Sequence, residues 1–334
     1  MSTAERIKQN LIETAEPVND FIFNLLQDRK PVELYRAGRH LLSAGGKRLR
    51  PFLTIKSCEA AGGSVKDAIP FAAAIEILHN FTLIHDDVMD HDEIRRGEPT
   101  VHVKYGEPMA ILAGDLLFSK VYQSVIDYAP AQMKASDVLS ALRKMTDGII
   151  ALCEGQALDI SFPDATNVSE DDYLFMIGAK TSALFKVSAE VGAIAAGASN
   201  NTVEALANFA WDAGIAFQIV DDILGITAKE STLGKPIGSD IREGKKTIIM
   251  IHGLRYADKK QKLTLLNAIK GCAVEQGVVD DAIQVLHDLG SIAYAKKKAD
   301  KYAKRSLESI NSLEETDAKK QLMELVNYFV QREY

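Results

Sequence analysis

Residues Ala72–Asp90 have the sequence AAAIEILHNFTLIHDDVMD, an apolar run that ends in a group of acidic side chains. Ile75, Leu78 and Thr82 recur at i, i+3 and i+7, the spacing of one helix face. Strict alternation of apolar and polar residues, the mark of a half-buried strand, is hard to find here or elsewhere. The stretch therefore predicts a long helix with carboxylates at its carboxyl end.

The rest of the chain has the same character. Glu204–Gly225 and Asp281–Lys304 have helical spacing, and only nine prolines interrupt the sequence. We find no linker rich in Pro, Ser or Gly and no repeat of fixed period. These patterns predict one all-α domain over residues 1–334, with several long helices side by side.

Composition excludes several classes of protein. The 334 residues are 47% hydrophobic and 25% charged, which is ordinary for a globular protein and unlike a disordered one. A net charge of −7 argues against nucleic-acid binding through bulk charge. Cys58, Cys153 and Cys272 are too widely spaced for a disulfide framework or a zinc ribbon. With no uninterrupted apolar span of about 18 residues, we expect a cytoplasmic protein without stable membrane insertion.

The acidic end of the first stretch predicts metal binding. Asp86 and Asp90 are four residues apart, so they lie on one helix face. Such carboxylates are natural ligands for Mg²⁺, which combines a few carboxylates with water and phosphate oxygens. A second acidic pair, Asp221-Asp222, also follows apolar residues, and Gln218 shares a face with Asp221. Either pair alone could be a surface acid patch, but two such pairs favour two metal-binding walls facing across a cavity.

Basic residues beside glycines complete the pattern. Arg forks two donors onto phosphate oxygens, Lys acts as a mobile point charge, and Gly permits close backbone approach. Each basic pair alone could be a solvated surface feature. Together with two acidic pairs they favour recognition of a diphosphate. The basic segments are Gly45–Pro51, Arg95–Gly97, Lys180-Thr181, Gly234-Lys235 and Glu243–Thr247.

Taken in this order, the motifs resemble those of the trans-isoprenyl diphosphate synthases, in particular the short-chain, archaeal-type farnesyl and geranylgeranyl diphosphate synthases. The resemblance covers nearly the whole chain. It implies an all-α bundle of long antiparallel helices around a deep central cavity. It also implies a homodimer and three Mg²⁺ ions per active site.

The resemblance also implies roles for individual residues. Gly225 stands where the common second motif has a third acid. The implied metal ligands are Asp86, Asp87, Asp90, Asp221 and Asp222. Isopentenyl diphosphate would be held by Lys47, Arg50, His79 and Arg96. The allylic diphosphate would be held by Arg95, Lys180, Thr181, Gln218, Lys235 and Lys245. The implied catalytic set is Asp86, Asp90, Arg95, Lys180, Asp221 and Lys235.

The implied reaction is Mg²⁺-assisted ionisation of an allylic diphosphate (dimethylallyl, geranyl or farnesyl), alkylation by isopentenyl diphosphate and loss of a proton. Phe81, five residues before Asp86, would lie about 7.5 Å deeper along the helix, at about 1.5 Å per residue. In the resembling family one aromatic at this depth, followed by a small residue such as Thr82, goes with a C20 product. We therefore expect geranylgeranyl diphosphate, with farnesyl diphosphate as a second product, and Phe81 and Thr82 at the floor that sets chain length.

Three other functions stay open on the sequence. A class I terpene cyclase would share the fold and the first acidic motif, but it would not need a second diphosphate site. A non-catalytic subunit of a heteromeric prenyl synthase would be expected to have lost its acidic motifs. A His-Asp metal phosphohydrolase could use His85-Asp86 and His91-Asp92, but that hypothesis leaves the second acidic pair unexplained.

Overall fold

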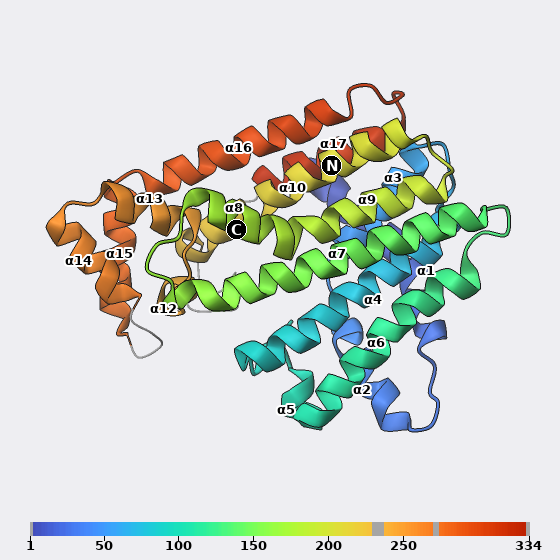
Figure 1. The fold of residues 1–334 in the computed structure, drawn as a ribbon, viewed down its shortest axis with the longest axis horizontal. Helices are drawn as coiled ribbons and strands as arrows, with labels where there is room; N and C mark the ends of the chain where they lie inside the picture. The colour runs from blue at the N-terminus through green and yellow to red at the C-terminus, as the bar shows by residue number, and fades with distance from the viewer. Residues whose placement is uncertain (1–2, 229–236, 270–273, 332–334) are drawn as a thin grey trace. The chain divides into compact units, whose positions relative to one another are not determined.

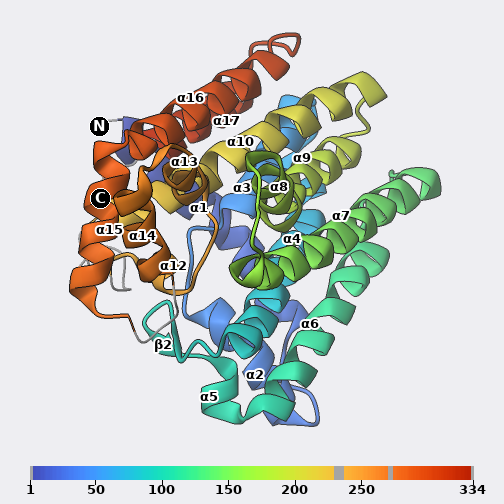
Figure 2. The same ribbon diagram turned by 60° about the vertical axis from the view of Figure 1, so that its left-hand side comes forward.

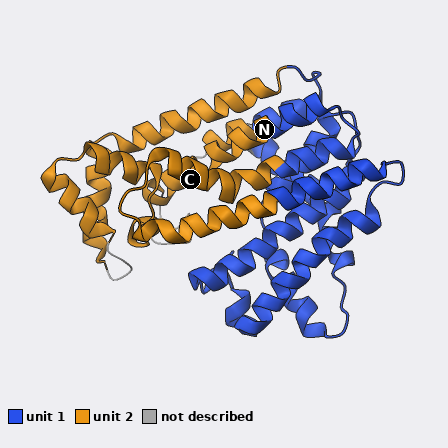
Figure 3. Ribbon diagram, viewed as in Figure 1, with its two compact units in different colours: residues 1–147, 187–207, 312–324 blue, residues 148–186, 208–311, 325–334 orange. Residues whose placement is uncertain are grey.

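The computed structural model describes residues 3–228, 237–269 and 274–331, and these are almost entirely helical (Figure 1). The all-α prediction is confirmed. The chain divides into two compact units (Figure 3). Unit 1 comprises Met1–Asp147, Val187–Ala207 and Ser312–Glu324, and unit 2 comprises Gly148–Lys186, Asn208–Asn311 and Leu325–Tyr334. Four helices contribute residues to both units: α7 (Ala135–Ser161), α9 (Ala183–Ala195), α10 (Asn200–Thr227) and α17 (Asp317–Val330). A single domain stays a prediction.

Unit 1 is built around two helices that lie side by side, α4 (Val65–Asp90) and α6 (Glu107–Tyr128) (Figures 1 and 2). They run antiparallel, because His85 lies against Gly114 while Phe81 packs on Phe118 further along α6. A Cβ at Gly114 would stand 2.1 Å from His85 Nε2, so a larger residue there would require the His85 ring to move. The other elements that lie wholly in unit 1 are α1 (Thr3–Leu25), α2 (Val32–Ser43), α3 (Leu49–Ala60), β1 (Ile94–Arg95), β2 (Glu98–Pro99) and α5 (Val101–Tyr105).

Helix α4 begins and ends with clear local signals. Ser64 and Asp67 form a capping box at its start, and His91 ends it with φ +56°. Asp87 and Asp90 lie in its last turn, which contains no basic residue, and Asp86 lies just before that turn. Carboxylates at a helix C-terminus meet the negative end of the helix dipole. The arrangement costs stability, which favours a functional reason for it.

Unit 2 packs a layer of short and long helices around an apolar core that includes Ile219, Ile248 and Met250. The predicted helical segment Asp281–Lys304 is in fact two helices, since the chain turns after Asp288 and restarts at Ser291. The elements that lie wholly in unit 2 are η1 (Phe162–Asp164), α8 (Glu170–Ile177), the π-helix η2 (Gly178–Ser182), α12 (Ser239–Arg242), α13 (Ile248–Tyr256), α14 (Lys259–Ala268), α15 (Gln276–Asp288) and α16 (Ser291–Ser309).

Two of the described helices, α4 and α6, are long and apolar enough to cross a membrane by length and composition alone. In α4 the apolar window is 72% buried inside the structure, and in α6 it is 44% buried. Core helices pass the same test, so this is weak evidence for a span. The expected lack of membrane insertion stays a prediction.

Candidate active site

A two-residue hairpin follows α4 and positions two of the predicted arginines. Strands β1 and β2 pair Arg95 with Glu98, and the connecting residues Arg96 and Gly97 have φ of +56° and +79°. Two central residues with positive φ define a type I′ turn, which matches the twist of the flanking strands. Gly97 adopts this conformation without strain, whereas Arg96 must be held in it.

Hydrogen bonds to backbone carbonyls hold Arg96. Its Nη1 donates to the carbonyl oxygens of Leu41 (2.8 Å) and Gly45, and weakly to Asn80 Oδ1 at 3.3 Å. The Leu41 carbonyl belongs to α2, and the loop that offers the Gly45 carbonyl is fixed in turn by Arg48. This buried arginine donates to Gly45 O and forms an ion pair with Glu76 of α4, with Nη1 and Oε1 2.9 Å apart. Arg48 and Glu76 therefore support the loop between α2 and α3.

His79 lies among the arginines that the sequence assigned to isopentenyl diphosphate. Arg50 Nη1 is 3.3 Å from His79 Nε2. Burial lowers the pKa of His79 well below its usual value, and the charges of Arg50, Arg96 and Arg95 lower it further. His79 is therefore neutral at pH 7 and accepts from Arg50. The structure thus brings Arg50, His79, Arg95 and Arg96 together, while Lys47 is exposed on the neighbouring loop.

The acids at the end of α4 differ sharply in their surroundings. Asp87 is 1% exposed, and its Oδ1 accepts a hydrogen bond from Arg95 Nε. Its Oδ2 is buried without a hydrogen-bond partner. Burial raises the pKa of Asp87, and Arg95 opposes that shift. Asp86 is half-buried and Asp90 is exposed, so these two carboxylates reach the surface of unit 1.

Phe81 belongs to a row of half-buried aromatic rings. Its ring centroid lies 5.3 Å from that of Phe118 on α6, and Phe118 lies 5.3 Å from Tyr122. On the other side, the Phe81 ring meets His85 at 4.8 Å. Thr82 is buried, and its Oγ1 donates to the His79 carbonyl at 2.8 Å. The two predicted floor residues therefore differ: Phe81 joins an aromatic row and Thr82 bonds to its own helix.

In unit 2 the π-helix η2 carries Lys180 and Thr181. Wide π-turns of this kind often occur at functional sites. Close packing accompanies the wide turn, because a Cβ at Gly155 of α7 would lie 2.3 Å from the Lys180 backbone nitrogen. Glycine at position 155 therefore lets α7 approach η2 closely at Lys180.

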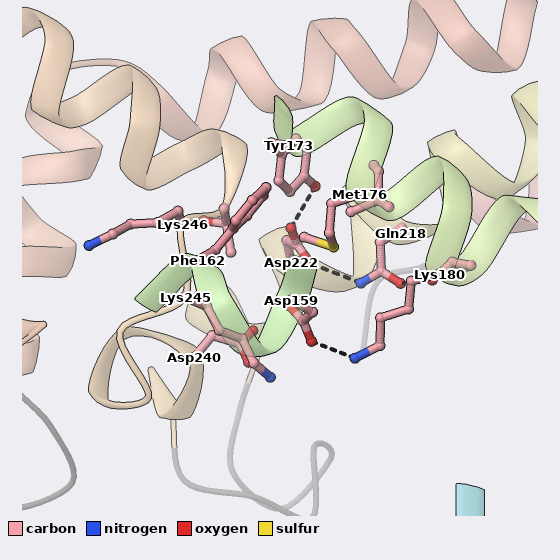
Figure 4. Close-up of a pocket in the computed structure, with 13 residues that line it drawn as sticks. Asp159, Phe162, Tyr173, Met176, Lys180, Gln218, Asp222, Asp240, Lys245 and Lys246 are labelled. Carbon is pink, nitrogen blue, oxygen red and sulfur yellow. Dashed lines mark hydrogen bonds and ion pairs between the residues drawn. The ribbon is translucent and has the colours of Figure 1, made fainter. Parts of the chain in front are cut away.

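A chain of hydrogen bonds joins η2, α10 and α8. Thr181 Oγ1 donates to Gln218 Oε1 at 2.9 Å, and Gln218 Nε2 donates to Asp222 Oδ1 at 3.0 Å. Tyr173 OH donates to the other carboxylate oxygen of Asp222 at 2.6 Å (Figure 4). Burial and the charge of Asp240 raise the pKa of Asp222 to about 7, although the bonds from Tyr173 and Gln218 lower it. Asp221, one residue away, is half-buried.

This network lines a cavity of about 100 Å³ within unit 2. Among its described lining residues are three carboxylic acids and three lysines: Asp159, Asp222, Asp240, Lys180, Lys245 and Lys246. Lys180 Nζ pairs with Asp159 Oδ2, and Lys245 Nζ pairs with Asp240 Oδ1 at 3.2 Å. Although burial opposes its charge, Asp240 and Glu243 raise the pKa of Lys245. The predicted diphosphate ligand Lys235 lies outside the described residues.

Gly225, at the position of the missing third acid, has Asp240 close by. A Cβ at residue 225 would stand 3.1 Å from Asp240 Oδ2, and the Gly225 carbonyl accepts from Gly238 N at 2.9 Å. The absence of a side chain at residue 225 thus leaves room for the carboxylate of α12.

The carboxylates fit Mg²⁺ by their chemistry. Asp87 has a buried oxygen with no hydrogen-bond partner, and Asp86 and Asp90 lie one turn apart on a helix end that carries no base. Among the described residues no group of three or more His, Cys, Asp or Glu side chains is arranged to hold an ion. Mg²⁺ usually keeps several waters and takes one or two carboxylates plus substrate phosphates, so a ready-made cage is not required.

Sequence reasoning did not single out several residues of these sites. Asp159, Tyr173 and Asp240 contact the predicted residues directly, and Arg48 and Glu76 support the arginine cluster. Gly155, in the middle of α7 and four residues before Asp159, is the one local sequence signal for this part of the site, because a glycine inside a helix suggests close packing.

Comparison with known proteins identifies the family. The polyprenyl synthetase family model matches residues 31–286. The chain belongs to the polyprenyl synthetase family. It is 44% identical over 301 residues to a geranylgeranyl diphosphate synthase of Sulfolobus acidocaldarius, covering 90% of each chain. It is 43% identical over 320 residues to a short chain isoprenyl diphosphate synthase of Methanothermobacter thermautotrophicus, covering 96% of this chain and 97% of the relative.

The solved structures agree. A geranylgeranyl pyrophosphate synthetase from Pyrococcus horikoshii superposes with a TM-score of 0.89 at 43% identity, covering 99% of this chain and 98% of that one. The resemblance drawn from the motifs is therefore confirmed, and so is the fold class. The polyprenyl synthetase family is Mg²⁺-dependent.

Proposed function

We propose that this enzyme condenses isopentenyl diphosphate with dimethylallyl, geranyl and farnesyl diphosphates to give geranylgeranyl diphosphate, with farnesyl diphosphate as a second product. One observation carries the proposal. Each unit has a long helix that presents adjacent carboxylates near its C-terminal end, beside a cluster of basic side chains. A chain folded only for stability would not keep such carboxylates at the negative end of a helix dipole.

The carboxylates would hold the metal. Asp86 and Asp90 in unit 1 and Asp221 in unit 2 are the direct ligands in this proposal, with three Mg²⁺ ions per site. Asp87 and Asp222 are buried and already accept hydrogen bonds, so they would support their neighbours. When bound, Mg²⁺ neutralises the charge that develops on a departing diphosphate.

The basic residues divide between the two substrates. Lys47, Arg50, His79 and Arg96 would bind isopentenyl diphosphate. Arg95, Lys180, Thr181, Gln218, Lys235 and Lys245 would bind the allylic diphosphate. His79 is neutral, so it would contribute a hydrogen bond and leave the charge to Arg50.

The chemistry needs few further groups from the protein. Cations around the allylic diphosphate stabilise the leaving group as the C–O bond breaks, and the double bond of isopentenyl diphosphate then attacks the carbocation. The released diphosphate can accept the proton that is lost. No dedicated protein base is needed.

Product analysis tests the proposal. The purified protein is incubated with Mg²⁺, isopentenyl diphosphate and each labelled allylic diphosphate, and the dephosphorylated products are separated by chromatography. We expect a C20 alcohol as the main product and turnover reduced about 100-fold or more in Asp86→Ala and Asp90→Ala, with helicity retained. A cyclic hydrocarbon made without isopentenyl diphosphate would instead identify a terpene cyclase, and an inactive chain would favour the non-catalytic subunit.

We also propose a cytoplasmic homodimer. Helix α6 exposes large apolar side chains on one face: Leu112 is 53% exposed and Ile126 is 62% exposed. A second copy of the chain would cover this face. Sedimentation of the protein and of Leu112→Glu tests the dimer, because a charge at the centre of such an interface should release monomers.

A further inference from the structure

The two described lysines assigned to the allylic diphosphate are already paired with carboxylates inside unit 2. Lys180 on η2 donates to Asp159 on α7, and Lys245 donates to Asp240 on α12. Lys245 Nζ is also 2.9 Å from Glu243 Oε2. Figure 4 shows both pairs on the wall of the same cavity. The positive charges of both lysines are therefore already neutralised by carboxylates when no diphosphate is bound.

Asp159 influences both lysines. It bonds to Lys180 directly, and its charge is among those that raise the pKa of Lys245. Its side chain is only 17% exposed, and that of Lys180 is 26% exposed, so water screens this pair weakly. Asp159 was assigned no role by the sequence motifs.

The pairing has a consequence for the form of ligand that can bind. A diphosphate without metal must take the lysines from their carboxylates and leave those carboxylates half-buried without a counter-charge. Both pairs are partly buried, so separating them in this way leaves poorly solvated charges without partners, which is unfavourable. A metal-loaded diphosphate brings its own cations, which can face the carboxylates while the lysines turn to phosphate oxygens.

We propose that Asp159 and Asp240 are specificity residues that make this site accept a metal-loaded diphosphate and discriminate against the free one. The inference rests on the proposed function, because it takes the unit 2 cavity as the allylic diphosphate site. It assigns to the two acids a role separate from metal ligation: they set the order in which metal and diphosphate can enter.

Calorimetric titration with inorganic diphosphate tests this inference on the full chain, once with excess Mg²⁺ and once with a chelator. The variant is Asp159→Asn, which keeps the shape of the side chain and removes its charge. The matched control is Asp164→Asn, which removes the same charge from an exposed position of unit 2 that does not line the cavity. Circular dichroism checks that each variant is folded.

We expect Asp159→Asn to bind metal-free diphosphate about tenfold more tightly than the wild type. A charge within about 4–6 Å typically changes an ionic equilibrium by one or more powers of ten. The affinity for the Mg²⁺ complex should stay level or fall, so the preference for the loaded form shrinks. Asp164→Asn should leave both affinities within twofold of the wild type.

Three outcomes would overturn the inference: unchanged metal-free binding in Asp159→Asn, an equal gain for both forms, or the same gain in Asp164→Asn. A wild-type protein that binds no diphosphate even with Mg²⁺ would instead refute the assignment of the cavity, and with it the proposed function. The two failures are therefore distinguishable.

Discussion

Replacing Phe81 by serine should lengthen the product by one isoprene unit. In the proposed enzyme the growing chain meets the Phe81 ring, which sits in a row with Phe118 and Tyr122. Because α4 and α6 run antiparallel, moving away from Asp86 along α4 corresponds to moving from Phe118 toward Tyr122 on α6. Tyr122 is four residues beyond Phe118, about 6 Å further along the helix.

The size of the opening limits the gain. Three bonds of an extended chain span about 3.3–3.6 Å, so the four chain bonds of an isoprene unit span about 4.5 Å. The space up to Tyr122 therefore admits one further unit and not two. We expect Phe81→Ser to make mainly C25 products, and Phe81→Ser combined with Tyr122→Ala to extend beyond C25. Two relatives that are 36% and 38% identical to this chain are named geranylfarnesyl diphosphate synthases.

Chromatography of dephosphorylated products, with farnesyl diphosphate as primer, measures the change. Phe175→Ser is the control, because it removes a 60% exposed ring from unit 2. A half-buried Phe should cost about 2 kcal/mol when truncated, below the 3–5 kcal/mol of a fully buried one. Unchanged product length in an active Phe81→Ser variant would show that the floor lies elsewhere. A jump to much longer products in that single variant would refute Tyr122 as the next barrier.

Further predictions concern the arginine cluster, the acid network and the thiols. Arg96→Ala should raise the KM for isopentenyl diphosphate about tenfold and the KM for the allylic substrate much less, because a charge-assisted hydrogen bond to phosphate is lost. Steady-state kinetics with each substrate varied in turn measures the two values. Equal effects on both KM values would contradict the division of sites. Tyr173→Phe removes a hydrogen bond that lowers the pKa of Asp222, so the pKa of Asp222 should rise above about 7. The acid limb of the plot of activity against pH should therefore move to higher pH. A plot identical to that of the wild type would argue against the network. Burial raises the pKa of Cys58 to about 12, and the charges of Asp67 and Glu59 add to the shift. At pH 8 an alkylating reagent should therefore modify exposed Cys153 and spare Cys58 until the protein unfolds. Mass spectrometry of the two cysteine-containing peptides measures the difference.

Local patterns were sufficient to predict the long helices. The apolar spacing before Asp86 predicted α4, and its structure differs only in where the capping residues place its ends. The segment Asp281–Lys304 was harder, because its apolar period continues across the turn that separates α15 from α16. The π-helix η2 has no sequence signal of its own. It depends on Gly155 of a separate helix allowing close contact, which is tertiary information.

The candidate site was predictable to a different degree in its two parts. Charged residues in family order could be assigned roles from their motifs, and the structure brings Arg50, His79 and Arg96 into one cluster. The partners that hold them could not be predicted. Asp159 is 21 residues from Lys180 in the chain, and only the packing of α7 on η2 brings their side chains together. Such pairings depend on contacts between helices, which spacing within one helix does not encode.

The structure gives a physical reason for paired aspartates in each motif. Consecutive residues on a helix point about 100° apart, so two adjacent carboxylates cannot serve the same ligand equally. In unit 1, Asp87 is buried and accepts from Arg95, while Asp86 is half-buried. In unit 2, Asp222 is buried and accepts from a tyrosine hydroxyl and a glutamine amide, while Asp221 is half-buried. The second carboxylate of each pair therefore fastens the helix end to a neighbouring donor, and this fixes the direction in which the first one points. An amide at either second position would keep the shape of the side chain and give up one of its two acceptor oxygens, so in the proposed enzyme the first carboxylate of each pair is the ligand and the second is the anchor.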